Sequence, residues 1–211
     1  MSSKLPALSN LPIPALTDLF YIVTPGIDPL GSFNITYAQL RAALLTTMPE
    51  VLEVNVTPVG NVGAGTDNLM SFSVPANTLA QNGDSFSAFM EGTLSAQDGG
   101  AGDQRTLTWS YGGNTVDTRI TQGVNAICRY QIEVNIFRKA ASGVGSTYFT
   151  SRWDAWNSTT AAAVITTFEV NGLMTIDHTA ANTFLMTGAS TDAVNNDVVQ
   201  NVLRMVKYPG V

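Results

Sequence analysis

The sequence predicts a mostly β protein, in which an antiparallel jelly-roll sandwich follows an extended arm and a small module of one β-hairpin and one helix. Three observations support this prediction. Apolar and polar residues alternate in short runs from about residue 51 onward, as they do in strands with one buried face. Turn signals rich in Gly and Asn separate these runs. The first 50 residues instead carry prolines and a helix-capping pattern.

The extended arm comprises residues 1–17. Pro6, Pro12 and Pro14 exclude a helix there, because proline lacks the amide hydrogen that a helix interior needs. Such a stretch favours extended chain and contributes little to a core.

Residues 18–50 form the predicted hairpin-helix module. Its strands are residues 18–23 and 31–35, on either side of a turn that contains Pro and Gly. A helix follows, because Thr36 can cap its first turn and Gln39 completes a capping box. A proline at position 49 ends this helix.

This module is too small to be stable alone, since chains of fewer than about 40 residues usually need staples or partners. We therefore expect it to fold against other copies of the chain or against another protein. The apolar side chains expected to make this contact are Phe20, Tyr21, Tyr37, Leu40 and Leu44.

Residues 51–211 form the predicted sandwich domain. Its clearest strand runs from Cys128 to Ile136, where every even position is apolar and every odd position is polar. Similar alternation marks residues 86–94, 107–111 and 164–170. The predicted turns include residues 82–84, 98–103, 112–114 and 171–172. Counting such runs gives about eight to ten strands, as expected for an antiparallel sandwich.

The last predicted strand, residues 198–206, carries apolar side chains on both faces. A one-sided sheet in a monomer would leave some of them exposed. Either this strand is central in its sheet, or its outer face contacts another subunit.

The composition excludes several classes of partner. Only 12% of the residues are charged, the net charge is -6 and the isoelectric point is near 4.5. An acidic surface repels a phosphate backbone, so nucleic acid is not an expected partner. No apolar run approaches the ~20 residues that cross a bilayer, and we find no signal-peptide pattern, so membrane insertion is not expected.

Residues that could carry catalysis or bind a metal are scarce. His178 is the only histidine, and Asp177 beside it would point to the other side of a strand or into a loop, so we assign His178 a structural or surface role. Cys128 is predicted to be a small core residue. Asp98 and Asp103 supply too few ligands for calcium. We therefore expect no enzyme, no cofactor and no metal site.

Residues 60–68, GNVGAGTDN, approach a phosphate-binding loop in their glycine spacing. Thr66 stands where that loop needs a lysine, and Asp67 would repel phosphate. An alternating run and Pro75 follow in place of a helix. We interpret this stretch as a turn between strands.

The stretch RWDAWN, residues 152–157, is the strongest candidate for a binding site. Trp153 and Trp156 offer aromatic faces for the CH groups of a sugar, and Asp154 offers a bidentate partner for its hydroxyls. The alternative places Trp153 in the core, on the face of Phe149, and Trp156 over a loop.

Two parts of the chain resemble bacteriophage structural proteins. ALTDLFYIVTPG followed by GSFNITYAQLRAALL resembles the N-terminal attachment modules of phage fibre and other virion appendage proteins. Residues 59–84 resemble the opening of jelly-roll domains in phage structural proteins, because a glycine loop, a strand, a Pro-Ala-Asn-Thr-Leu turn and an Asn-Gly-Asp turn follow in that order.

The resemblance implies a non-enzymatic virion structural protein of the fibre, spike or decoration type. It implies a homotrimer whose N-terminal region docks to other virion proteins of the tail or capsid, and whose β domain projects outward. Such proteins assemble in the host cytoplasm. The alternative is a domain of a phage tail fibre that binds a host surface glycan through Trp153, Asp154 and Trp156.

Overall fold

The chain divides into two compact units, Met1–Met48 and Pro49–Val211. The computed structural model describes residues 19–22, 33–36, 39–40, 44, 47–95, 104–122, 127–157 and 164–210. The predicted arm, residues 1–17, lies outside the described residues.

The first unit contains the predicted hairpin. Strand β1 (Leu19–Ile22) pairs antiparallel with β2 (Phe33–Thr36). The capping box is also present: the Gln39 amide donates to Thr36 Oγ1 over 3.1 Å, and the Thr36 amide donates to Gln39 Oε1 over 2.9 Å. Leu40 and Leu44 are helical, which agrees with a helix that starts at this cap.

The second unit is built from eleven strands in its described residues, arranged in sheets of seven and four strands. The bounds are β3 (Glu50–Asn55), β4 (Val59–Gly60), β5 (Gly65–Val74), β6 (Ser85–Leu94), β7 (Gln104–Tyr111), β8 (Asn114–Gln122), β9 (Cys128–Arg138), β10 (Thr147–Asn157), β11 (Val164–Met174), β12 (Asn182–Ser190) and β13 (Val198–Tyr208). Every pairing between them is antiparallel.

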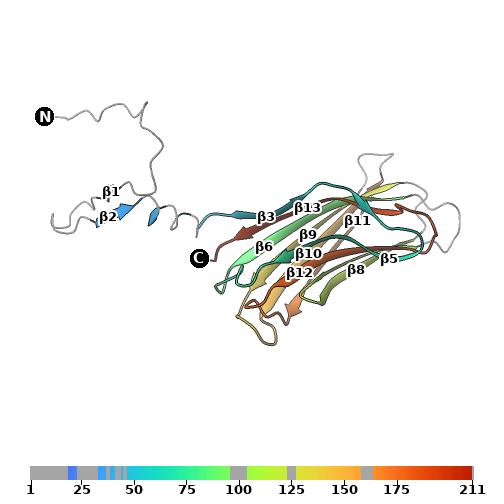
Figure 1. Ribbon diagram of the computed structural model, residues 1–211. Coiled ribbons are helices and arrows are strands. Elements are labelled where there is room, and N and C mark those ends of the chain that lie inside the picture. Colours follow the sequence, from blue (N-terminus) through green and yellow to red (C-terminus); the bar gives the residue numbers. More distant parts are fainter. Residues whose placement is uncertain are drawn as a thin grey trace, which may run out of the picture. The chain divides into compact units, whose positions relative to one another are not determined.

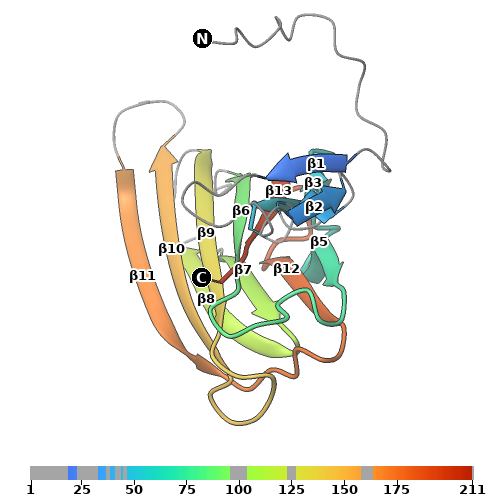
Figure 2. The same cartoon turned by 90° about the vertical axis from the view of Figure 1, so that its left-hand side faces the viewer.

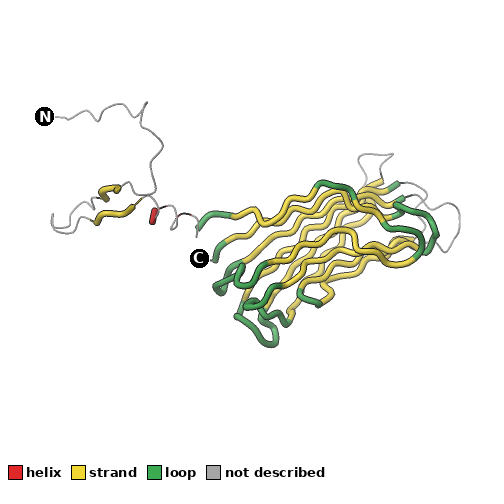
Figure 3. The backbone as a smooth tube through the Cα atoms, viewed as in Figure 1, coloured by secondary structure: helices red, strands yellow, loops and turns green. Residues whose placement is uncertain are grey.

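The two sheets form a jelly-roll sandwich, as predicted. The larger sheet has the order β11-β10-β9-β6-β13-β3, with β4 also paired to β13, and the smaller has the order β5-β12-β7-β8. The chain crosses between the sheets after β4, β5, β6, β8, β11 and β12. Figures 1 and 2 show the sheets as two layers, and Figure 3 shows most of the loops at their two ends.

The core lies between the sheets, because alternate side chains of each strand point inward. The exposed fraction alternates strictly along β6 and β7, and in β9 Cys128 is buried, as predicted. Trp109 of the smaller sheet and Trp153 of the larger sheet are both at most 1% exposed. Burial of such aromatic groups supplies much of the folding free energy.

Strand β13 lies between β6 and β3, inside the larger sheet. Of the two alternatives for this apolar strand, the structure shows the central position. Its neighbours on both sides pair with its backbone, and Val198, Leu203 and Met205 are buried in the core.

One predicted turn was wrong. Asn171 and Gly172 lie within β11, where Gly172 faces Phe149 of β10. A Cβ atom at Gly172 would come within 2.9 Å of the Phe149 ring, so glycine makes room for this side chain. The predicted turn at Gly112 and Gly113 is present; both have positive φ, and they join β7 to β8.

In the glycine-rich stretch at residues 60–68, only residues 61–64 form a turn; Gly60 ends β4 and residues 65–68 begin β5. Asn61 holds this turn in place. This side chain is fully buried. Its Nδ2 donates to the carbonyls of Gly63 and Val194, over 2.9 and 3.3 Å, and its Oδ1 accepts from the Val198 amide over 2.8 Å. Asn61 therefore joins the turn before β5 to the start of β13.

An ionic cluster, in which Arg105 and Asp197 are buried and Asp192 is half-buried, closes the same end of the sandwich. Arg105 Nη2 lies 3.1 Å from Asp192 and 3.3 Å from Asp197. The hydroxyls of Ser95 and Ser190 donate to the Asp197 carboxylate over 2.6 and 2.7 Å. The Asp197 charge is thus paired and hydrogen-bonded, as burial requires.

We expect Asn61→Ala to lower the free energy of unfolding by about 2 kcal/mol or more, because it leaves the Val198 amide and two carbonyls without these partners. Urea unfolding of the full chain measures this loss. Asn68→Ala is the matched control, since Asn68 is exposed on β5. Equal losses in the two variants would contradict the anchoring role of Asn61.

His178 has a structural role, one of the two that the sequence allowed. Its ring is 2% exposed, and Nε2 lies 2.8 Å from the Thr147 hydroxyl. Burial lowers the pKa of His178, and the positive charge of Arg138 lowers it further, while Asp177 acts in the opposite direction. The folded protein therefore holds His178 neutral at pH values where the unfolded chain already binds a proton.

We expect the free energy of unfolding to fall as the pH decreases below 6.5, the ordinary pKa of histidine. The unfolded chain then binds more protons than the folded chain, so protonation favours unfolding. Urea unfolding between about pH 5 and pH 7, above the range where most carboxylates titrate, measures this slope. In His178→Gln the slope should flatten, because the chain has no other histidine; an unchanged slope would assign it to other groups.

Candidate functional site

The candidate site is the outer face of the seven-stranded sheet. Strict alternation places the odd-numbered residues of β6 and β9 and the even-numbered residues of β10 on this face. The register brings side chains from neighbouring strands into rows that cross the sheet. The central row is Glu169, Arg152, Glu133, Phe89 and Arg204, from β11, β10, β9, β6 and β13.

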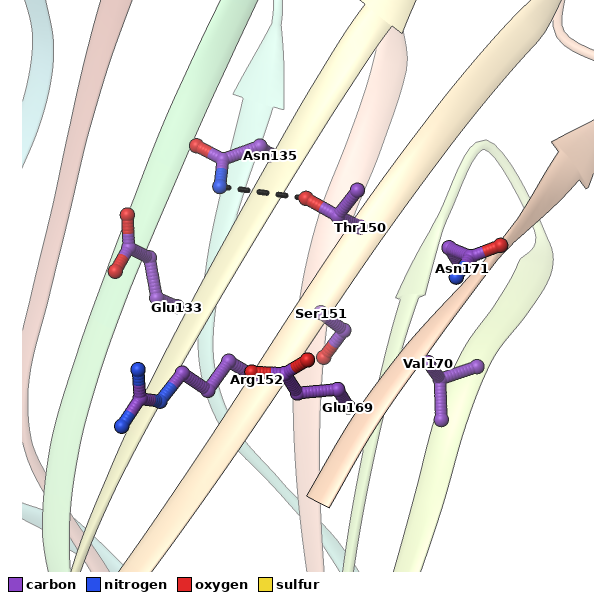
Figure 4. A pocket seen from close by; sticks show the side chains of 8 residues that line it. All are labelled: Glu133, Asn135, Thr150, Ser151, Arg152, Glu169, Val170 and Asn171. Atoms are coloured by element: carbon purple, nitrogen blue, oxygen red, sulfur yellow. Dashed lines mark hydrogen bonds between the residues drawn. The ribbon is translucent and has the colours of Figure 1, made fainter. Parts of the chain in front are cut away.

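Three hollows on this face are lined in part by the central row. The largest, of about 250 Å³, spans β9, β10 and β11 and is shown in Figure 4. Its outward polar side chains are Glu133 and Asn135 of β9, Thr150 and Arg152 of β10, and Glu169 and Asn171 of β11; Ser151 and Val170 also line it. Hollows of about 170 and 100 Å³ continue toward β6 and β13. Glu133 lines all three.

Hydrogen bonds link the side chains of the neighbouring row, which contains Ser87, Asn135 and Thr150. The Ser87 hydroxyl donates to Asn135 Oδ1. Asn135 Nδ2 in turn donates to the Thr150 hydroxyl over 3.4 Å (Figure 4). These three side chains come from β6, β9 and β10, so this row links three strands and holds the amide of Asn135 in one orientation.

Asp154 orients Arg152 along the strand. Arg152 donates from Nε and Nη2 to the two Asp154 oxygens, over 2.9 and 3.4 Å, and the Thr167 hydroxyl donates to the same carboxylate over 2.7 Å. Glu133 faces Arg152 across the strands, yet no hydrogen bond or ion pair within the described residues engages its carboxylate. Glu133 is thus an available acceptor at the centre of the hollows.

The structure brings together two of the three residues proposed for glycan binding. Asp154 and Trp156 lie on the outer face of β10, where Asp154 also lines the smallest hollow. Trp153 points to the opposite face, is 1% exposed and stacks on Phe168 with ring centres 5.6 Å apart. A surface site on this sheet therefore cannot include the Trp153 ring. Trp153 lies in the core, as the alternative interpretation of the sequence placed it.

Phe168 lies at the open edge of the sandwich. Its ring is 40% exposed, and the Arg119 guanidinium from β8 lies 4.4 Å from the ring centre. Cation–π contacts of this kind stabilise the pair and cover part of the aromatic surface. Arg119 also forms an ion pair with Asp117. The contact between Arg119 and Phe168 connects β8, at the edge of the smaller sheet, to β11, at the edge of the larger sheet.

The residues proposed for attachment lie in the first unit. Phe20 and Tyr21 belong to β1, and Leu40 and Leu44 to the helical segment after the capping box. Leu44 is 50% exposed. Tyr37 lies outside the described residues.

Within the described part of the chain, no group of three or more His, Cys, Asp or Glu side chains is placed to bind a metal ion. Nor does a helix in this part have the length and apolar character to cross a membrane.

Burial raises the pKa of the Tyr130 phenol, whose hydroxyl donates to the Val199 carbonyl over 3.1 Å.

The sequence did not point to Glu133, Asn135 or Phe89 as site residues. Each looks like an ordinary outward position of an alternating strand. Their proximity depends on β6 pairing with β9, although two strands separate them in the chain. The only usable sequence signal was that outward positions of these strands hold few lysines and many amides and hydroxyls.

Neither protein-family models nor curated proteins match the sequence. Several solved structures share some of its architecture. The CBM2 module of the evolved Dit of Lactobacillus casei BL23 phage J-1 is 8% identical, with a TM-score of 0.42, over 77% of this chain and 97% of that chain. Peanut lectin is 7% identical, with a TM-score of 0.37, over 76% of this chain and 98% of that chain.

A structure of infectious bursal disease virus, Gt strain, aligns with 97% of this chain and 40% of the viral chain, at 14% identity and a TM-score of 0.32. All three TM-scores lie below 0.5. These chains therefore identify neither a family nor a function, and the assignment of function depends on the residues of this chain.

Proposed function

We propose that the protein is a non-enzymatic structural protein of a bacteriophage particle, of the fibre, spike or decoration type. The first unit docks to the particle, the sandwich projects outward, and the chain forms a homotrimer. The resemblance to phage attachment modules and jelly-roll domains supports this proposal. The local structures on which it rests, the β1–β2 hairpin, the capping box at Thr36 and the turn after β5, are present.

The turn after β5 illustrates this agreement. The Thr78 hydroxyl donates to the Pro75 carbonyl over 2.8 Å, and Asn77 adopts a positive φ. Leu79 is 1% exposed, so it plugs the core between the sheets. Gly83, also with positive φ, leads into β6. The Pro-Ala-Asn-Thr-Leu and Asn-Gly-Asp segments therefore serve the fold and carry no chemistry of their own.

The observation that carries self-association is a series of exposed apolar side chains where the sandwich begins. Val51, Val54 and Val56 are between 55% and 65% exposed. They lie in and just after β3, which has a strand on only one side among the described residues. An apolar edge strand is a surface for pairing with another chain. A second copy of the protein is the partner we propose for it.

We expect the full chain to have a mass near three times 22.4 kDa by light scattering at micromolar concentration. Val54→Asp should raise the dissociation constant at least tenfold, about 1.4 kcal/mol, because it would bury an unpaired charge in the contact. Val144→Asp is the matched control, since Val144 is 98% exposed in the β9–β10 loop. A monomeric wild-type chain, or equal effects of the two variants, would contradict the proposal.

A second candidate function is recognition of a host surface glycan. Asp154 and Trp156 favour it, because both lie on the outer face that carries the hollows. An aromatic ring beside a carboxylate can meet both the CH face and the hydroxyls of a sugar.

For this candidate we expect Trp156→Ala to abolish binding of the full chain to a glycan array while the thermal unfolding transition shifts little. The contrasting variant is Trp153→Ala, which should lower stability by about 3–5 kcal/mol because it empties a core position. Retained glycan binding in Trp156→Ala would rule out the role of this ring.

A further inference from the structure

The three hollows on the outer face form one path across the strands. Glu133 lines all of them, Arg152 lines the two toward β11, and Phe89 lines the two toward β13. The path therefore crosses β11, β10, β9, β6 and β13. Neighbouring strands lie about 4.8 Å apart, so it extends over about 19 Å. We infer that this path binds an uncharged, extended oligosaccharide that lies across the strands, with Glu133 as its central hydrogen-bond acceptor.

The path is lined by groups that suit sugar hydroxyls. A hydroxyl both donates and accepts, so its site must offer donors and acceptors side by side. Asn135 and Thr150 offer both, Arg152 offers donors, and Glu133 offers acceptors. The contacts of Asn135 with Ser87 and Thr150, and of Arg152 with Asp154, fix these groups before a ligand binds. Less conformational entropy is then lost on binding.

The charges on the path select against acidic ligands. Arg152 is already paired with Asp154, and Arg204 lies against the Phe89 ring at 6.0 Å. The two arginines and the three carboxylates of Asp154, Glu133 and Glu169 give the path a net charge of -1, which is part of the net charge of -6 on the chain. An acidic glycan, phosphate or nucleic acid would be repelled. A neutral polyhydroxyl chain meets no such penalty.

Apolar surface adjoins the polar lining at one end of the path. Phe89, Val206 and Tyr208 line the hollow toward β13, and Tyr208 is 42% exposed. An aromatic ring beside hydrogen-bonding groups is what the alternating CH and OH surfaces of a sugar require. A protein partner fits less well, since the centres of protein interfaces are depleted in charged residues such as Glu.

This inference deepens the second candidate function and is independent of the proposal that the protein belongs to a phage particle. It also differs from a site centred on Trp156, because Glu133 lies in the row beyond Asp154. Because Glu133 and Trp156 lie in different rows, substitutions at these two residues can distinguish the two binding sites.

The experiment uses the full chain on an array of neutral oligosaccharides (glucans, mannans, galactans and N-acetylhexosamine chains) beside an equal set of sialylated and uronic-acid glycans. We expect binding to at least one neutral chain, with longer chains bound more tightly than disaccharides. Titration calorimetry with that chain then compares variants. Glu133→Gln should weaken binding at least tenfold, because the amide replaces one acceptor oxygen with a donor. Asn135→Ala should weaken it similarly.

The matched control is Glu50→Gln, the same change on β3 of the same sheet but outside the hollows, which should leave binding unchanged. Equal melting temperatures of the wild-type chain and the three variants show that folding is intact. Absence of neutral-glycan binding, binding confined to acidic glycans, or full binding by Glu133→Gln would overturn the inference. Loss of binding in Trp156→Ala with full binding in Glu133→Gln would overturn it while supporting the second candidate function. A monomeric mass in light scattering would affect only the virion proposal.

Discussion

The constraint on which the rest of the structure depends is that both sheets bury one face against the other. Because side chains alternate with a period of two, each inward residue fixes its neighbours outward, and a slip of one residue would expose the whole core. Trp109, Tyr130 and Trp153 are at most 1% exposed and come from three strands of two sheets. Their packing sets the register of those strands. The register then sets the rows of side chains on the outer face, so the composition of that face can change without loss of the core.

Closure of the sandwich at one end depends on polar groups, unlike the core. Asn61 joins residues that are more than 130 positions apart in the chain, and the buried Arg105 and Asp197 form an ionic cluster with Asp192 nearby. Apolar packing is tolerant of small displacements, whereas buried polar groups must be hydrogen-bonded in one geometry. These residues therefore specify how the loop after β4 meets the start of β13. The turn needs glycines for its backbone, but the buried asparagine determines its position.

The fold could be predicted because its signals are local. Residues 128–136 alternate without exception, and the capping box at Thr36 lies within four residues. Prediction failed where a local signal has a nonlocal cause: Gly172 indicated a turn, but it makes room for Phe149 of the neighbouring strand. The candidate site is harder still, since Glu133 and Phe89 become neighbours only through the pairing of β9 with β6. No spacing in the sequence records that pairing.

The same reasoning explains why Trp153 and Asp154, adjacent in sequence, have different roles. In a strand, adjacent side chains always lie on opposite faces, so a motif of consecutive residues cannot form one surface. Only residues two apart, such as Asp154 and Trp156, share a face, and the remaining members of a site must come from other strands. A binding surface on this protein is therefore built across the sheet, by one or two residues from each strand. The row from Glu169 to Arg204 has this arrangement, which is why a ligand that crosses the strands fits it better than one that follows a single strand.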